Sequence, residues 1–281
     1  MAARADRLIP DRPPFARALR RWRDRRRLSQ LELAIRSGVS QRHLSFLELG
    51  RSSPSRDMVL RLGEALELPL RDCNSLLGLA GFAPGYRERG LEDPDMQPVR
   101  EALRLMLDCH EPNPAMVVDR DWNVLMVNRA IQRLFGLFGD VDALWARSCG
   151  DGPRNALRAM FHPQGLRPLI RNWDTVAPVM LSRSRREAEA DDNRELLAML
   201  DELAGAAGGA PAAGAHDERP HPPVVALELG TDEQSVSLFS VIYTFGTPQD
   251  VTTDEVRVET FFPADDDTAR LLRSNANCKA S

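Results

Sequence analysis

The chain has 281 residues, enough for two domains, and it contains no run of about 18 apolar residues that would span a membrane. Its net charge of −4 is unevenly distributed. Residues 1–80 hold sixteen Arg, no Lys and nine acidic residues, so this part has a net charge of +7 and the remainder of the chain has −11. A basic N-terminal part joined to an acidic body is typical of a nucleic-acid-binding domain attached to a second domain.

The first 13 residues are polar and contain Pro10 and Pro13, so they predict a flexible arm. A first helix is predicted over residues 15–27, where Phe15, Leu19 and Trp22 recur at helical spacing. These three side chains should form one apolar face that packs inward.

Residues 29–51 predict two short helices joined by a tight turn. Ser29 can cap the first helix, and Glu32, three residues later, completes a capping box. Gly38 can adopt the positive φ at which this helix must stop, and Ser40 can cap a second helix that ends at Gly50. The apolar side of the first helix is predicted to comprise Leu31, Leu33, Ala34 and Ile35. In the second helix Leu44 and Leu47 are predicted to face inward, and Gln41, Arg42, His43 and Ser45 to face away.

This arrangement is the form of a helix-turn-helix, because short polar and basic side chains near a helix N-terminus fit a major groove. An ordinary helical hairpin is the alternative.

Two more helices are predicted after this motif. One is capped by Ser55 and has an inner face of Met58, Leu62, Ala65 and Leu66, and the other covers residues 70–79 and ends at Gly81. We place an all-α domain at residues 14–81 and a linker, rich in Pro, Gly and charge, at residues 82–97.

Residues 15–80 resemble the Cro/C1-type helix-turn-helix family (XRE family), whose members are five-helix DNA-binding domains. The resemblance rests on Leu28-Ser29-Gln30, Leu33-Ala34, Gly38-Val39-Ser40, Leu44-Ser45, Glu48, Gly50 and Pro54-Ser55. It implies a transcriptional regulator that binds a two-fold DNA operator as a homodimer.

The resemblance also implies, by position, that Gln41, Arg42 and Phe46 read bases. Arg42 can pair with guanine and Gln41 with adenine, whereas Phe46 either touches a thymine methyl group or belongs to the core. Gln30 at the start of the first short helix is placed to contact a phosphate, with a solvated cap residue as the alternative. The full predicted DNA-binding set is Gln30, Ser40, Gln41, Arg42, His43, Ser45, Phe46 and Arg51.

Glu48 is an acidic residue in a basic domain. The resemblance implies that it forms a structural ion pair with Arg23 of the first helix. Two unlinked surface charges are the alternative.

The hydrophobic pattern changes after residue 114. Residues 116–118 and 122–127 predict two short strands that Asn128 ends, followed by a helix over residues 129–138. Further strands are predicted at residues 224–229, 236–245 and 255–262, and in the last of these Val256, Val258, Thr260 and Phe262 alternate with charged or exposed positions. Other helices are predicted at residues 99–109, 155–161, 169–189 with a bend near Pro178, 193–203 and 265–273.

Residues 204–223 are dominated by Ala, Gly and Pro and predict a flexible insert. Around this insert we expect an α+β domain at residues 98–275, with one antiparallel sheet of about five strands and several helices.

This second domain is similar to the ligand-binding domain of the MmyB-like transcription regulators, which has a PAS-like fold. The matching pieces are Asn113-Pro114-Ala115, Asp121-Trp122-Asn123-Val124, Asn128, Arg154-Asn155-Ala156-Leu157, Asn172-Trp173-Asp174, Thr244-Phe245-Gly246-Thr247-Pro248 and Phe261-Phe262-Pro263-Ala264. Two features depart from the family: Pro178 falls inside a helix, and the insert replaces a segment that usually carries aromatic residues.

The resemblance implies a long apolar ligand such as a fatty acid, the only bound cofactor expected. The residues predicted to line its pocket are Trp122, Met126, Leu134, Phe135, Leu157, Phe161, Trp173 and Val176, with an ordinary hydrophobic core as the alternative. A carboxylate head group needs a cation, for which Arg154, Arg158 and Arg171 are the candidates.

Nothing in the sequence indicates catalysis or a metal. The four cysteines form no C-x-x-C pair, the histidines are isolated or lie in the insert, and Ser182 and Ser184 lie in no nucleophile motif. We therefore expect a cytoplasmic, ligand-responsive, DNA-binding transcriptional regulator without enzymatic activity. In the alternative, the C-terminal domain binds no ligand and serves only dimerisation or a protein partner.

Overall fold

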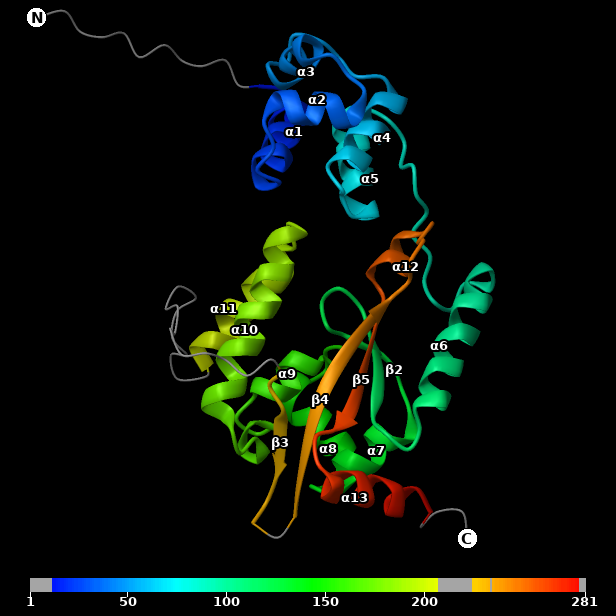
Figure 1. Ribbon diagram of the computed structural model, residues 1–281, viewed down its shortest axis with the longest axis vertical. Coiled ribbons are helices and arrows are strands. Elements are labelled where there is room, and N and C mark those ends of the chain that lie inside the picture. Colours follow the sequence, from blue (N-terminus) through cyan, green and yellow to red (C-terminus); the bar gives the residue numbers. More distant parts are fainter. Residues whose placement is uncertain (1–11, 207–223, 233, 278–281) are drawn as a thin grey trace, which may run out of the picture. The chain divides into compact units, whose positions relative to one another are not determined.

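The computed structural model describes residues 12–206, 224–232 and 234–277. The chain divides into two units, residues 1–88 with 249–251 and residues 89–248 with 252–281. Figure 1 gives the order of the helices and strands along the chain.

The N-terminal unit is helical. Its five helices are α1 (Pro14–Arg25), α2 (Gln30–Ser37), α3 (Gln41–Glu48), α4 (Arg56–Ala65) and α5 (Leu70–Leu79). They enclose one apolar core, in which Leu19, Leu33, Leu44, Leu47 and Leu62 are fully buried. The predicted five-helix domain is therefore confirmed.

Residues that act locally set the ends of these helices. The Ser29 hydroxyl accepts a hydrogen bond from the Glu32 amide, and the Glu32 carboxylate accepts one from the Ser29 amide, so the capping box is present. Gly38 ends α2 with φ of 67°, in the left-handed region that a residue with a Cβ adopts at a cost. Ser40 and Ser55 cap α3 and α4, as predicted.

The predicted apolar face of α2 is partly wrong. Leu33 and Ala34 are buried, but Leu31 and Ile35 are 52% and 72% exposed. The face that α2 turns inward is formed by Leu33, Ala34 and Ser37, and Leu31 and Ile35 lie away from it because a helix turns about 100° per residue. On α4 the inner face also includes Val59, which is fully buried.

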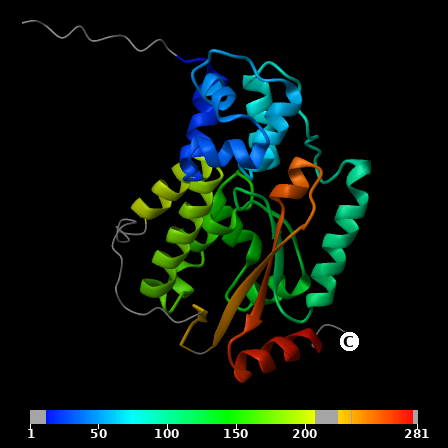
Figure 2. The same ribbon diagram turned by 45° about the horizontal axis from the view of Figure 1, so that its top comes forward.

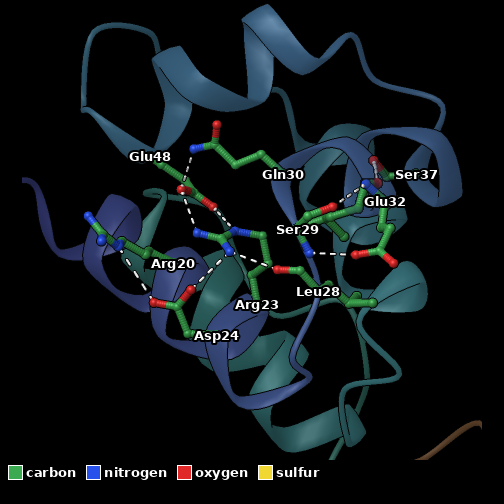
Figure 3. A network of polar contacts seen from close by, with 10 residues as sticks. Arg20, Arg23, Asp24, Leu28, Ser29, Gln30, Glu32, Ser37 and Glu48 are labelled. Carbon is green, nitrogen blue, oxygen red and sulfur yellow. Dashed lines mark hydrogen bonds and ion pairs between the residues drawn. The ribbon is translucent and has the colours of Figure 1, made fainter.

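A buried carboxylate joins three of these helices (Figure 3). Glu48 of α3 has a side chain that is 3% exposed and accepts two hydrogen bonds from Arg23 of α1, from Nε to Oε1 at 2.6 Å and from Nη2 to Oε2 at 3.1 Å. Gln30 of α2 donates from Nε2 to Glu48 Oε2 at 2.8 Å, and Arg23 Nη1 donates to the Leu28 carbonyl at 2.8 Å. The hydrogen bond to Glu48 raises the pKa of Arg23. The ion pair expected from the sequence is therefore formed, and Gln30 extends it.

The C-terminal unit contains a five-stranded antiparallel sheet of order β2-β1-β5-β4-β3, which confirms the predicted α+β class. Its strands are β1 (Ala115–Val118), β2 (Val124–Val127), β3 (Leu227–Gly230), β4 (Ser235–Thr244) and β5 (Arg257–Pro263). Central β5 pairs with both β1 and β4, with Val117 opposite Val258 and Val241 opposite Thr260.

Helices cover both faces of this sheet (Figure 2). On one face α6 (Gln97–His110) packs Leu103 and Leu107 against Val117 and Val258. On the other face lie α7 (Arg129–Gly136), α9 (Ala156–Phe161), α10 (Trp173–Ala190) and α11 (Arg194–Ala206), which form the larger core together with β-strand residues such as Met116 and Val118. Successive residues of β1 therefore belong to different cores, because side chains alternate along a strand. The helix α13 (Asp266–Asn277) contributes Leu272 to the larger core.

Several predicted boundaries need correction. Two helices were not predicted, α8 (Val141–Cys149) and α12 (Val251–Glu255). The second strand begins at Val124 instead of 122, because Trp122 has φ of 67° and belongs to the turn. Helix α10 begins at Trp173, after a short 3-10 turn at Arg167–Leu169, and continues through Pro178. Of the predicted insert, residues 204–206 are the end of α11, and residues 207–223 lie outside the described residues.

We predict that Gly38→Ala destabilises the N-terminal unit by about 1–2 kcal/mol, because it forces an alanine into the left-handed region. No atom lies within 4 Å of the added Cβ, so backbone strain alone is tested. The matched control is Gly78→Ala inside α5, which also meets no atom within 4 Å and should stabilise by about 0.5–1 kcal/mol. Urea denaturation gives the free energy of unfolding of both variants. Equal effects of the two substitutions would contradict the prediction that the positive φ of Gly38 makes alanine costly at this position.

We also predict that Glu48→Ala costs about 3–5 kcal/mol of stability, because it leaves the guanidinium of Arg23 and the amide of Gln30 without their acceptor. The control is Asp24→Ala, which removes the 2.9 Å ion pair of Arg23 with a carboxylate that is 54% exposed. An exposed pair contributes less than about 1 kcal/mol. Similar unfolding free energies for the two variants would show that Glu48 is not the organising charge.

Candidate DNA-binding surface and ligand-binding core

The first turn of α3 presents side chains suited to a DNA groove. Gln41 and Arg42 are exposed, and the Arg42 guanidinium lies 5.5 Å from the centre of the Phe46 ring. Within the part of the chain that the structure describes, Arg42 makes no hydrogen bond or ion pair. The guanidinium is therefore available for a base or a phosphate, and the half-buried Phe46 ring beneath it limits where it can point.

The other predicted DNA-binding residues lie around this turn. Ser40 is exposed and uses its hydroxyl to accept from the His43 amide, Ser45 is half-buried, and Arg51 is exposed just beyond α3. His43 is half-buried, and its Nε2 has no hydrogen-bond partner among the described residues. These positions agree with a surface around the N-terminus of α3, and their contacts with DNA stay a prediction.

The position of Gln30 differs from the simple expectation of a side chain free to meet a phosphate. Its amide already donates to Glu48 (Figure 3), which leaves one amide hydrogen for another partner. Gln30 therefore connects α2 to α3 in the protein, and a phosphate contact through the same amide has to coexist with that bond.

Most of the predicted ligand-contacting residues lie together in the larger core of the C-terminal unit. Its members include Trp122, Leu134, Phe135, Leu157, Phe161, Trp173 and Val176. The rings of Phe161 and Trp173 meet edge to face, with centroids 5.1 Å apart. Met126 does not belong to this group, because it packs on the opposite face of the sheet with the α6 residues Leu103 and Leu107.

The three predicted cations do not point into that core. Arg154 is exposed and donates to Asp142 at 2.8 Å, Arg158 binds the Glu202 carboxylate with two bonds of 3.1 and 3.0 Å, and Arg171 is exposed and donates to the Thr231 carbonyl at 2.9 Å. The hydrogen bond to Glu202 raises the pKa of Arg158. All three guanidiniums are thus engaged by partners near the surface.

A cation that the sequence did not single out lies beside the core instead. The guanidinium of Arg183 on α10 lies 5.3 Å from the centre of the Trp122 ring. In the sequence, Arg183 and Glu187 have the i,i+4 spacing of a surface pair, and Arg183 Nε does donate to Glu187 Oε1 at 3.2 Å. Only the fold shows that the turn before β2 brings Trp122 under the same side chain.

No group of three His, Cys, Asp or Glu side chains in the ranges that the structure describes is arranged to hold a metal ion. None of the described helices is long and apolar enough to cross a membrane.

Comparisons with known proteins agree with the two-part organisation. Residues 14–76 match a family model described as a helix-turn-helix domain, and residues 99–274, more than half of the chain, match one described as the MmyB-like transcription regulator ligand binding domain. No curated protein matches the chain.

The solved structures that are similar to the chain include a PAS domain and a light-oxygen-voltage receptor. The PAS domain of Bordetella pertussis BvgS has 14% identity and a TM-score of 0.29, with 66% of this chain and 98% of that chain covered. An RNA-binding light-oxygen-voltage receptor has 13% identity and a TM-score of 0.24, with 94% of this chain and 62% of that chain covered. With a Cro/C1-type helix-turn-helix domain followed by this ligand-binding domain, the chain belongs to the MmyB-like transcription regulators.

Proposed function

We propose that this regulator binds a two-fold DNA operator as a cytoplasmic homodimer, and that its C-terminal domain senses a small apolar ligand of the fatty-acid type. The observation that carries the DNA-binding part is the Arg42 side chain, which is exposed in the first turn of α3 and makes no hydrogen bond or ion pair with a described residue. The +7 charge of residues 1–80 supports it, because arginine–phosphate contacts supply the sequence-independent part of DNA affinity. No catalytic step belongs to the proposal.

The ligand-binding part is supported by the composition of the larger core. Aromatic side chains from several separate parts of the chain, among them Trp122, Phe161 and Trp173, gather on one face of the sheet. Small-molecule sites are lined mainly by such side chains, with a few polar groups that fix the orientation of the ligand. A fatty acid fits this composition through its apolar tail.

Arg42→Ala is predicted to lower affinity for the operator by about 1–3 kcal/mol and to relax preference at one base pair, because a bidentate contact to a base is lost. The operator is first obtained by selection from random duplexes, and affinity is then measured by fluorescence anisotropy. The control is Arg61→Ala, which replaces an exposed arginine on α4 and should change the affinities for cognate and scrambled duplexes by the same factor. If Arg42→Ala leaves the ratio of cognate to scrambled affinity unchanged, Arg42 does not read a base.

Ligand and operator are predicted to change each other's affinity by the same factor. A ligand shifts DNA affinity only if it binds two conformations unequally, and linkage then makes the coupling reciprocal, typically at ~1–3 kcal/mol. The measurement is the affinity of the full chain for a fluorescent long-chain fatty acid, with operator, with scrambled duplex and with no DNA. Equal affinities in all three conditions would leave a lipid-binding domain without a switch. No fatty-acid binding in any of them would favour a C-terminal domain that serves only dimerisation or a protein partner.

A further inference from the structure

A small polar cluster lies at the sheet face that α10 covers. We call it the Arg183 cluster, and it consists of Trp122 before β2, Arg183 on α10, and Ser240 and Glu259 on β4 and β5. Trp122 and Glu259 are 1% and 3% exposed. Glu259 shares its face of β5 with Phe261, which packs on the larger core, so the cluster borders the apolar residues proposed to hold the ligand.

The cluster contains donors without acceptors. Trp122 Nε1 and Arg183 Nη2 are both buried, and neither has a hydrogen-bond partner among the described residues. The same holds for the hydroxyl of Ser184, which is fully buried next to Arg183 on α10. A buried donor left unpaired costs about 1–3 kcal/mol, and nearly all such groups in proteins are paired. Two of them belong to side chains from distant parts of the chain, with the guanidinium 5.3 Å from the centre of the indole ring, and this pairing points to a place where an acceptor binds.

The carboxyl groups nearest to Arg183 already have hydrogen-bond partners in the protein. Glu187 accepts from Arg183 at 3.2 Å through Oε1 and from Arg257 at 2.7 Å through Oε2. Burial raises the pKa of Glu259, whose carboxyl group hydrogen-bonds Ser240, and this favours its neutral form. Both oxygens of Glu187 therefore already accept a hydrogen bond, and no described carboxylate accepts one from Arg183 Nη2 or Trp122 Nε1.

We propose that the Arg183 cluster binds the carboxylate head group of the ligand, with Arg183 Nη2 and Trp122 Nε1 as the donors. This rests on the proposed function of the C-terminal domain as a sensor of an apolar ligand. A carboxylate offers two acceptor oxygens and forms strong, charge-assisted bonds to a guanidinium. The apolar tail of the same molecule then extends along the larger core, to which the Trp122 ring also belongs.

The test compares a fluorescent long-chain fatty acid with its methyl ester on the full-length protein. Wild type should bind the acid at least about tenfold more tightly than the ester, a factor typical of one charge-assisted bond. Arg183→Met should remove that preference while ester affinity stays unchanged, because the tail contacts remain. The matched control is Arg158→Met, which loses an arginine already paired with Glu202 and should keep the wild-type preference.

Trp122→Phe gives an independent readout, since it removes Nε1 and keeps an aromatic ring in the core. It should lower affinity for the acid several-fold more than affinity for the ester, and it provides the test if Arg183→Met does not fold. An unchanged acid preference in both variants, or a wild type that binds acid and ester equally, overturns the head-group site and leaves the apolar sensor intact. Failure of wild type to bind either molecule overturns the proposed function itself.

Discussion

The carboxylate of Glu48 is the charge on which the N-terminal domain depends. It lies inside the apolar core of a strongly basic unit and receives donors from two other helices, Arg23 of α1 and Gln30 of α2. A buried charge is tolerated only when it is paired and its lone pairs are used. Because Glu48 is the last residue of α3, its partners fix the position of that helix, and with it the direction in which Arg42 and Gln41 project.

The features that sequence analysis predicted well are those that local chemistry decides. Ser29 with Glu32, Gly38 and Ser40 define α2 and α3 through contacts within a few residues, and these ends came out as predicted. The five strands were found from their period-two pattern and β-branched residues, although their ends moved by up to three residues. In the C-terminal unit the helices α8 and α12 were missed, although α9 and the strands β1, β2 and β3, which are shorter than α8, were predicted.

What could not be predicted depends on contacts between distant residues. Helix α8 is held by Trp145 packing against Phe135 and by Leu144 packing in a core with Leu166, and a local pattern reveals neither contact. Ile35 and Leu33 have similar apolar character, and only the packing of α2 decides that the first is exposed and the second buried. Glu259 was expected among the charged or exposed positions of its strand, but it is 3% exposed because helices cover both faces of this central strand.

The two polar clusters of the protein differ in one physical respect, and this difference assigns them different tasks. Around Glu48 the buried carboxylate accepts three hydrogen bonds, and Arg23 Nη1 contacts both the Leu28 carbonyl and the Asp24 carboxylate, so the buried charge is fully paired and holds one arrangement of helices. Around Arg183 the donors of Trp122 and Arg183 exceed the acceptors that the surrounding described residues offer. A fully paired network gains no hydrogen bonds when a ligand binds. Buried donors without acceptors, in contrast, are stabilised when a ligand supplies an acceptor. The N-terminal cluster therefore fixes a structure, and the unpaired donors of the C-terminal cluster are the physical reason for proposing a carboxylate site there.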